Sequence, residues 1–296
     1  MYGPMDPALH KSVEQRIRDT APVWGGPVWH ALGEGVGGAR WRLGWGDELW
    51  FVKTGNSEIL VAEADGLAAL AGSAVVRVPA VLASYTGPEG SYLLLEWLPL
   101  AQKQPASAAR LGEALAALHL KRASGFGWPR HNFIGATPQF NTPGDDWAVF
   151  FRDQRLRFQL RLAAENGYHG VLQEQGERLA IGLSRFFAGY TPRPALLHGD
   201  LWGGNWGSLL DGGPVIFDPA VYHGDRETDL AMTELFGGFG PEFYAAYRMH
   251  APLDQGYGVR RQLYNLYHVL NHLNLFGGAY LEQALSMIKS LLAELR

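Results

Sequence analysis

The sequence contains no cysteine among its 296 residues. This absence excludes disulfide bonds, zinc sites built from cysteine, iron–sulfur clusters and thiol nucleophiles. Basic residues are also few, because 25 Lys and Arg against 29 Asp and Glu give a formal net charge of −4 and an isoelectric point near 6.2. The chain therefore lacks the strongly basic character that is typical of nucleic-acid-binding proteins.

Long hydrophobic runs are missing as well. Apolar stretches such as 93–95 and 114–118 fall far short of the roughly 20 residues that cross a bilayer. The residues before Pro7 do not combine a basic segment with an apolar one, as a secretory signal would. We therefore expect a cytoplasmic protein that binds neither membranes nor nucleic acids.

Glycine, in contrast, is abundant: the chain has 38, against about 21 in a protein of average composition and this length. The glycines of the first third separate short segments typical of strands, and apolar residues recur at helical spacing from Ser107 onward. The expected strands cover 40–43, 49–53, 75–85 (interrupted by Pro79) and 91–97, and the expected helices follow Pro7 and Ser57 and cover 107–119, 147–189 and 261–295. We predict an α+β protein with a small β-rich lobe over 1–98 and a larger, mainly helical lobe over 99–296.

The first candidate for chemistry is a glycine cluster at 33–38, which reads Gly-Glu-Gly-Val-Gly-Gly. Gly33, Gly35 and Gly38 satisfy the pattern G-x-G-x-x-G, and Gly37 adds a further glycine. In a dinucleotide-binding fold this pattern opens a helix, whereas a hairpin follows here. The arrangement favours a glycine loop that folds over phosphates between two antiparallel strands. A glycine turn without a ligand is the alternative.

Lys53 and Glu63 form the second candidate. Lys53 ends an apolar strand, on the same face as Phe51. On the expected helix that follows, Glu63 falls within the inward stripe set by Leu60 and Leu67. An unpaired buried charge costs several kcal/mol, so two inward charges need each other. A lysine held by a glutamate can contact nucleotide phosphates; a purely structural ion pair is the alternative.

The third candidate is the segment 198–205, His-Gly-Asp-Leu-Trp-Gly-Gly-Asn, followed by the short apolar strand 215–217 and Asp218. Phosphoryl transfer needs a carboxylate that accepts the proton of the attacking hydroxyl, and oxygen ligands for the Mg²⁺ that accompanies ATP. Asp200 matches the base, and Asn205 and Asp218 match the ligands, in kind and in order. Together with the glycine cluster and the inward lysine, this combination indicates a phosphotransferase.

Two further groups of residues keep more than one interpretation. Asp225, Glu227 and Asp229 either contact a cationic or polyhydroxyl substrate, or brace the catalytic loop and cap the next helix. We expect bracing for Asp229 and leave Asp225 open. His268 and His272, four residues apart, could share a metal. We favour packing or substrate contact, because no H-E-x-x-H carboxylate accompanies them.

At this point the motifs resemble the protein-kinase-like fold of small-molecule kinases, which includes aminoglycoside phosphotransferases and choline kinases. More narrowly, the chain is similar to the fructosamine-3-kinase family over about residues 30–280. The segments that carry this narrower resemblance are 126–127, 132–135, Gln139, Asn141, Trp147, 196–205, 218–227, 229–232, 236–239, 270–272 and 276–277.

The resemblance implies a kinase with ATP as co-substrate and Mg²⁺ as cofactor. It would transfer the γ-phosphate to a sugar hydroxyl of a ketosamine, the adduct of a sugar with an amine, in the repair of glycated molecules. By motif, Lys53 would hold the α- and β-phosphates and Glu63 would orient it. The backbone of Glu96, Trp97 and Leu98 would meet the adenine.

The same resemblance implies roles for the catalytic segment. Asp200 would act as the base, and Asn205 and Asp218 would bind Mg²⁺. We assign Trp202 and Asp225 to the sugar side, because an indole face suits a sugar ring and a carboxylate suits hydroxyls or a cationic amine.

The chain departs from the family in its glycine loop. It reads Gly33-Glu34 where relatives usually have two adjacent glycines, so the resemblance leaves the conformation of the loop open. Some relatives carry a cysteine in this loop that is linked to redox-controlled dimerisation. This chain has none, and a disulfide-linked partner is excluded.

Two alternatives to a ketosamine kinase remain. An aminoglycoside- or choline-type kinase of the same fold would keep the catalytic motifs, but the context of Trp202 and of Asp218-Pro219-Ala220 favours the ketosamine interpretation. A non-catalytic relative would be expected to have lost Lys53, Asp200, Asn205 or Asp218, and all four are present.

Overall fold

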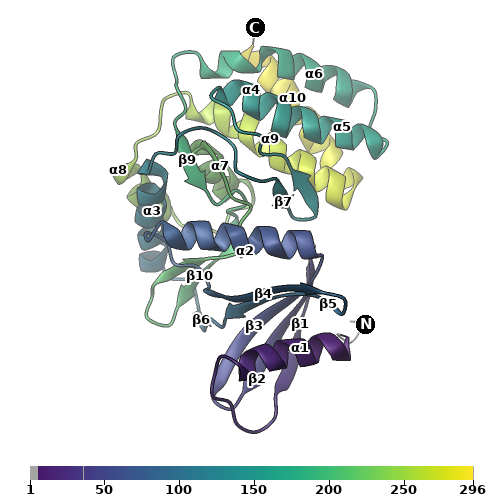
Figure 1. Cartoon of the computed structure of the whole chain (residues 1–296). Helices are drawn as coiled ribbons and strands as arrows, with labels where there is room; N and C mark the ends of the chain where they lie inside the picture. The colour runs from purple at the N-terminus through teal and green to yellow at the C-terminus, as the bar shows by residue number, and fades with distance from the viewer. Residues whose placement is uncertain (1–5, 36, 296) are drawn as a thin grey trace.

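The computed structural model of the chain describes residues 6–35 and 37–295 and has two lobes (Figure 1). The smaller lobe holds a five-stranded antiparallel sheet in the order β1-β2-β3-β5-β4. Its strands are β1 (Val28–Gly35), β2 (Gly38–Trp45), β3 (Glu48–Gly55), β4 (Val81–Gly87) and β5 (Gly90–Glu96). Helix α1 (Pro7–Arg18) covers one face of the sheet, and α2 (Ser57–Gly72) lies between the other face and the larger lobe.

Strand β5 shows why the sheet needs both helices. Successive side chains of a strand point to opposite faces. Tyr92 and Leu94 pack in the same cluster as the apolar side of α1, whereas Leu93 and Leu95 pack with α2. All four side chains are at most 3% exposed. A strand that is apolar at successive positions is thus buried on both sides, as its sequence predicts.

Two expected helix starts are wrong by one or two residues. The cap of α2 is Asn56 rather than Ser57, since Asn56 Oδ1 accepts hydrogen bonds of 2.9 and 3.1 Å from the backbone N–H groups two and three residues ahead. The next helix begins at Pro105, two residues before the expected cap. The hydroxyl of Ser107 is instead buried, 2.8 Å from the hydroxyl of Ser208.

The expected strand 75–85 is shorter than predicted. It begins only at Val81, because Pro79 has no N–H group to donate to a neighbouring strand. The residues before it lie between α2 and β4. There the carbonyl of Arg77 accepts a hydrogen bond of 3.0 Å from the N–H of Ile216, which belongs to the larger lobe.

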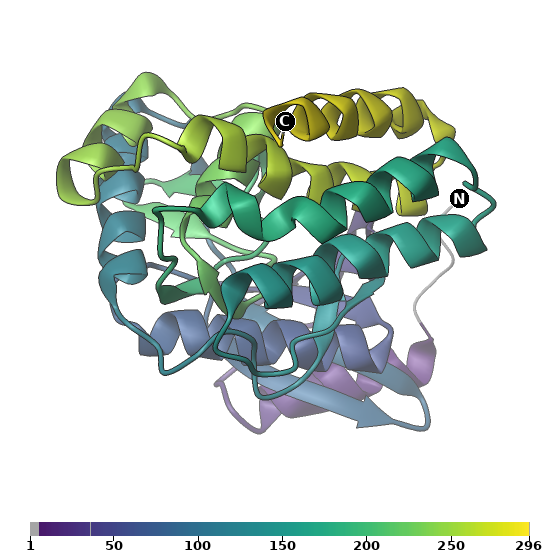
Figure 2. The ribbon, with the colours of Figure 1, turned by 90° about the horizontal axis from the view of Figure 1, so that it is seen from above.

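The larger lobe is mainly helical. Its helices are α3 (Pro105–Leu120), α4 (Trp147–Phe151), α5 (Arg157–Glu165), α6 (Val171–Gly182), α7 (Glu227–Leu235), α8 (Pro241–His250), α9 (Tyr257–Phe276) and α10 (Leu281–Glu294). Figure 2 shows α9 and α10, in yellow, beside the teal and green helices α5 and α6. Helix α9 is central, since 12 of its 20 residues are buried. Within the described residues, no helix is both long and apolar enough to span a membrane.

Short strands lie in the segments that connect these helices. They are β6 (Leu100–Ala101), β7 (Asn132–Ile134), β8 (Thr137–Gln139), β9 (Pro194–Leu197), β10 (Trp206–Leu209), β11 (Pro214–Ile216) and β12 (Tyr222–Asp225). Strand β6 pairs with β10 directly after the chain leaves the smaller lobe. One hydrophobic cluster also crosses the boundary, with Leu67 and Leu93 from the smaller lobe and Leu115, Leu201 and Val221 from the larger. The two lobes therefore share a core.

Candidate active site

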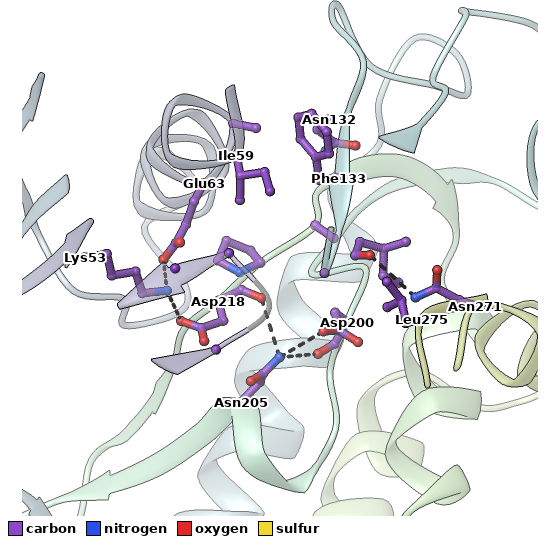
Figure 3. Close-up of a pocket in the computed structure, with 18 of the residues that line it drawn as sticks. Lys53, Ile59, Glu63, Asn132, Phe133, Asp200, Asn205, Asp218, Asn271 and Leu275 are labelled. Atoms are coloured by element: carbon purple, nitrogen blue, oxygen red, sulfur yellow. Dashed lines mark hydrogen bonds and ion pairs between the residues drawn. The ribbon is translucent and has the colours of Figure 1, made fainter. Parts of the chain in front are cut away.

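A cavity of about 500 Å³ lies where the two lobes face each other. The glycine cluster, β2, β3 and α2 form one wall, and β7, the segment 200–205, the segment 218–220 and α9 form the other (Figure 3). Among the residues that line it are Gly35, Gly37, Gly38, Arg40, Lys53, Glu63, Asn132, Phe133, Asp200, Trp202, Asn205, Asp218, Phe236, Asn271, His272, Phe276 and Tyr280. Most of the residues that the sequence predicts for phosphoryl transfer are therefore brought together here.

Lys53 lies in the wall of the cavity between two carboxylates. Its Nζ lies 2.6 Å from Glu63 Oε1 on α2 and 2.6 Å from Asp218 Oδ1 in the larger lobe. Burial acts to lower the pKa of Lys53, but Glu63 and Asp218 outweigh this effect and the net shift is upward. Lys53 is therefore a fixed cation, held by one carboxylate from each lobe.

Asp200 lies beside Asn205 on the wall formed by the larger lobe. Asn205 Nδ2 donates to the backbone carbonyl of Asp200 (2.8 Å) and to its carboxylate Oδ2 (3.3 Å). Burial first, and the charge of Asp218 second, raise the pKa of Asp200 to about 7. A carboxylate that titrates near neutral pH suits a general base.

A hairpin places Asn205 and Asp218 next to each other. Strands β10 and β11 pair so that Trp206 faces Ile216, and the N–H of Phe217 donates to the carbonyl of Asn205 (3.1 Å). Asp218 then takes the left-handed conformation, with φ of 57°. This conformation is uncommon for residues other than glycine and is concentrated at functional sites.

The loop that carries Asp200 is braced from behind by Asp229. The Asp229 carboxylate accepts hydrogen bonds from the N–H groups of His198 (2.7 Å) and Gly199 (2.8 Å) and lies 3.2 Å from His119 Nε2. Gly199 has φ of 83°, and a Cβ there would lie 2.0 Å from the carbonyl oxygen of Ala220. Only glycine fits this turn, and the predicted bracing role of Asp229 is confirmed.

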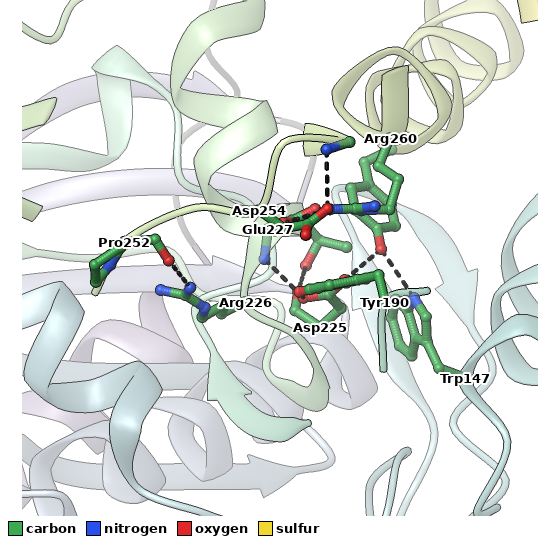
Figure 4. Close-up of polar contacts among 11 residues, drawn as sticks. Trp147, Tyr190, Asp225, Arg226, Glu227, Pro252, Asp254 and Arg260 are labelled. Atoms are coloured by element: carbon green, nitrogen blue, oxygen red, sulfur yellow. Dashed lines mark hydrogen bonds and ion pairs between the residues drawn. The ribbon is translucent and has the colours of Figure 1, made fainter. Parts of the chain in front are cut away.

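Asp225 is not part of the cavity, which corrects our assignment of this residue to the sugar side. It is fully buried, and its carboxylate accepts hydrogen bonds from Tyr190 (2.9 Å), Tyr264 (2.5 Å) and the N–H of Glu227 (3.1 Å) (Figure 4). Glu227 in turn binds Arg260 at 2.7 and 3.0 Å. The carboxylate oxygens of Asp225 are therefore not available to a substrate, because they already accept hydrogen bonds from residues of the larger lobe.

Four other predicted residues lie outside the lining of the cavity. Gly33 belongs to β1, next to an irregularity in its pairing with β2. Glu96, Trp97 and Leu98 follow the end of β5; the Glu96 carboxylate forms an ion pair with Arg77 and does not face the cavity. Adenine contact with this backbone stays a prediction. Val36 of the glycine cluster lies outside the described residues.

The lining includes His272, for which we expected packing or substrate contact, and aromatic residues to which the sequence assigned no role in the site. Four of the aromatic lining residues form a cluster around His272. The His272 ring lies 4.9 Å from Phe236, 5.4 Å from Phe276 and 5.2 Å from Tyr280, measured between ring centroids. Trp202, a predicted substrate residue, also lines the cavity and is 40% exposed. Phe236, His272 and Phe276 lie in segments that carry the family resemblance, but the sequence assigned no role in the site to Phe236 or Phe276 and did not single out Tyr280.

The oxygen atoms beside Lys53 fit a magnesium ion. Asn205 makes its hydrogen bonds through Nδ2, which leaves its amide oxygen available toward the cavity that it lines with Asp218. Among residues 6–35 and 37–295, no three His, Cys, Asp or Glu side chains are arranged to hold a metal by themselves. Mg²⁺ is usually held by one or two carboxylates together with substrate phosphates, and the donor set here is of that kind.

Comparison with known proteins supports this interpretation. A family model described as fructosamine kinase matches residues 29–294. The chain is 45% identical to a probable ketoamine kinase of Synechocystis sp. over 83% of this chain and 84% of that protein. It is 39% identical to a chloroplastic protein-ribulosamine 3-kinase of Arabidopsis thaliana, over 83% and 77% of the two chains.

Solved structures agree with the expected fold. A crystal structure assigned to a fructosamine-3-kinase of Haemophilus somnus superposes with a TM-score of 0.85 at 28% identity, covering 96% of this chain and 97% of that one. An aminoglycoside-3'-phosphotransferase of type VIII superposes with a TM-score of 0.55 at 22% identity, covering 89% and 98%. The predicted two-lobed, protein-kinase-like α+β fold is confirmed.

Proposed function

Because this chain belongs to the fructosamine kinase family, we propose that it transfers the γ-phosphate of ATP to a sugar hydroxyl of a ketosamine. The observation that carries the proposal is the convergence of Lys53, Asp200, Asn205 and Asp218 on one cavity. These are the parts that phosphoryl transfer requires: a cation for the phosphates, a base for the hydroxyl and oxygen ligands for Mg²⁺. A cytoplasmic location would supply the ATP that the reaction consumes.

Asp200 is the proposed base. Its carboxylate, with a pKa of about 7, can accept the proton of the attacking sugar hydroxyl near neutral pH. The hydrogen bond from Asn205 Nδ2 fixes the orientation of this carboxylate. Asp229 holds the backbone of the loop, so that the base stays in place when the acceptor enters.

Lys53 is the proposed phosphate ligand. Glu63 positions its ammonium group, and Gly35, Gly37 and Gly38 of the glycine cluster line the same cavity. Mg²⁺, when bound through Asn205 and Asp218, would neutralise charge on the phosphates. Most of the work of the protein is then to align the hydroxyl with the γ-phosphate and to stabilise charge.

The aromatic part of the cavity lining is the proposed acceptor subsite. Trp202, Phe236 and Phe276 are each between 40% and 56% exposed, and they line the same cavity as Asp200. Aromatic faces attract cationic amines and offer flat apolar surfaces to sugar rings. A ketosamine has both groups, and the names of the sequence relatives point to the same substrate class.

The test is ADP release in the presence of Mg²⁺, with Asp200→Asn as the blank. The acceptors are ribulose-lysine, fructose-lysine, kanamycin, choline and free sugars. We expect turnover with the two ketosamines and none with kanamycin or choline. Turnover with kanamycin or choline alone would contradict the ketosamine assignment and favour an aminoglycoside- or choline-type kinase.

A further inference from the structure

Arg40 faces the same cavity as Lys53. In the antiparallel pairing of β2 with β3, Arg40 stands directly opposite Lys53, and side chains at directly opposite positions share one face of a sheet. Both residues line the cavity. The strand register therefore brings a second basic side chain to the site, although the residue lies outside every motif in the sequence.

The guanidinium group of Arg40 lies over the glycine cluster. A Cβ atom built on Gly35 would fall 2.0 Å from Arg40 Nη2 and 2.8 Å from its Cζ. Gly35 therefore leaves the space that the guanidinium occupies. The Arg40 side chain is in this way directed toward the loop that is expected to fold over phosphates.

In the part of the chain that the structure describes, Arg40 forms no ion pair with the carboxylates of the cavity, although its positive charge acts on both Glu63 and Asp218. Arg40 and Lys53 carry like charges at directly opposite positions of two strands, and such charges repel. The ion pairs of Lys53 with Glu63 and Asp218 offset this repulsion. Both carboxylates are thus bound to Lys53. Within the described residues, Arg40 takes part in no ion pair or side-chain hydrogen bond. Its N–H groups remain available for an anion that enters the cavity.

We propose that Arg40 binds the phosphates of ATP. Its guanidinium group would contact them from the side of Gly35, next to Lys53 on the same face of the sheet. The planar guanidinium group matches phosphate oxygens through paired hydrogen bonds. The inference rests on the nucleotide part of the proposed function and is independent of the acceptor. According to this proposal, Arg40 raises the affinity for ligands that carry phosphates and leaves the affinity for adenosine unchanged.

The first test is calorimetric binding of adenosine, ADP and a non-hydrolysable ATP analogue to Arg40→Gln, in buffer with a metal chelator and again with Mg²⁺. Hydrogen bonds to charged groups predict a loss of roughly tenfold to a hundredfold in affinity for the ATP analogue. The loss for adenosine should stay within about twofold, since adenosine carries no phosphate. Arg16→Gln on α1 is the matched control, because Arg16 is exposed and α1 packs against the opposite face of the same sheet.

A second test uses Gly35→Ala. The added methyl group would displace the flexible tip of Arg40, so this variant should lose affinity for the ATP analogue as Arg40→Gln does. The double variant should lose little more than either single variant, which a double-mutant cycle measures. Additive losses would overturn the contact between Gly35 and Arg40 on which the proposal depends.

Other outcomes separate this inference from the proposed function. Unchanged affinity for the ATP analogue in Arg40→Gln, or an equal loss for adenosine, would overturn the inference. An increase in the KM of the acceptor with unchanged nucleotide affinity would assign Arg40 to the acceptor and would also overturn it. These binding measurements contain no acceptor, so a failure of the ketosamine assignment alone would leave the result for Arg40 intact.

Discussion

Asp200 and Lys53 divide the work of the site between a group that changes its charge and a group that keeps it. The pKa of Asp200 is raised to about 7 by burial and by Asp218, so that this carboxylate can take up a proton near neutral pH. Lys53 is buried between Glu63 and Asp218, which raise its pKa further. The arrangement keeps a permanent cation where phosphates are expected, and a proton acceptor where a hydroxyl is expected.

Replacement of Asp200 by asparagine tests the base. The amide has nearly the same shape but cannot accept the proton of the hydroxyl. We expect kcat to fall by roughly 10²–10⁴-fold, while the affinity for ATP stays within about twofold. Steady-state kinetics and nucleotide calorimetry measure the two quantities; turnover close to that of the wild type would refute the assignment of the base.

His268 makes the stability of the protein depend on pH. It is buried in α9, and burial first, then the charge of His272, lower its pKa to about 3 from the ordinary 6.5. The folded pKa lies below the unfolded one, so the unfolded chain binds the proton first as the pH falls below 6.5. This residue therefore costs stability between pH 6.5 and about 3.

Replacement of His268 by leucine should remove this pH dependence. Between pH 7 and pH 5 we expect the unfolding free energy of the wild type to fall by about 2 kcal/mol more than that of His268→Leu. Urea unfolding at the two pH values measures the difference, and His169→Gln, at an exposed position, is the control. Parallel stability curves for the wild type and the leucine variant would contradict the prediction.

At the scale of residues, local motifs were predictable and tertiary contacts were not. The segment 198–205 places Asp200 and Asn205 by local geometry, and a single hairpin adds Asp218. Arg40, in contrast, reaches the site through strand register, which no local pattern reveals. Asp225 was misassigned because its partner Tyr264 lies 39 residues away in the sequence.

At the scale of elements, α2 is the connection between the lobes. Glu63 of this helix forms an ion pair with Lys53. Asp65 of the same helix accepts, through Oδ2, a hydrogen bond of 2.8 Å from Trp128 Nε1 in the larger lobe. The sequence predicted the inward stripe of this helix from its apolar spacing. It did not predict the link to Trp128, because that residue lies in a loop without a periodic pattern.

Replacement of Trp128 by phenylalanine tests this link. An aromatic side chain is kept, but the indole N–H donor is lost and the phenyl ring is smaller, so we expect the unfolding free energy to fall by at least about 1–2 kcal/mol. Asp218 still holds Lys53 from the larger lobe, and kcat should change by less than about threefold. A double-mutant cycle with Asp65→Ala isolates the coupling, whereas a tenfold loss of kcat would mean that the link positions Glu63.

Helices α3 and α8 pack closely through Gly112. A Cβ atom at this position would lie 2.2 Å from the carbonyl oxygen of Phe243, so Gly112→Ala must separate the two helix backbones. We expect a loss of about 1–3 kcal/mol in unfolding free energy, as for other overpacked sites. Gly72→Ala at the end of α2 is the matched control, because its Cβ would meet nothing within 4 Å. Equal stability of the two variants would contradict the close packing.

At the scale of the whole molecule, the two lobes share a hydrophobic cluster that the sequence does not predict. The change from glycine-separated strands to helical spacing predicts two parts, and the boundary after residue 98 stays a prediction. The shared core was not predictable, because the cluster joins Leu67 and Leu93 to Leu115 and Leu201. Which distant leucines meet is decided by the tertiary fold rather than by local spacing.

Because of this shared core, the chain should unfold as one unit. We expect a single calorimetric transition whose measured enthalpy equals the van't Hoff enthalpy, and a nucleotide analogue should move that single transition to a higher temperature. Two resolved transitions, of which only one responds to the nucleotide, would contradict a common core.

The ion pairs of Lys53 have a consequence for how the two lobes can move. Its two carboxylate partners, one from each lobe, are both in contact with it. Glu63 comes from α2 in the smaller lobe and Asp218 from the segment after β11 in the larger lobe, so the two contacts connect the lobes through one ammonium group. Any motion that moves the lobes apart at this point must break one of these two contacts, so opening of the cavity is coupled to the charge on Lys53.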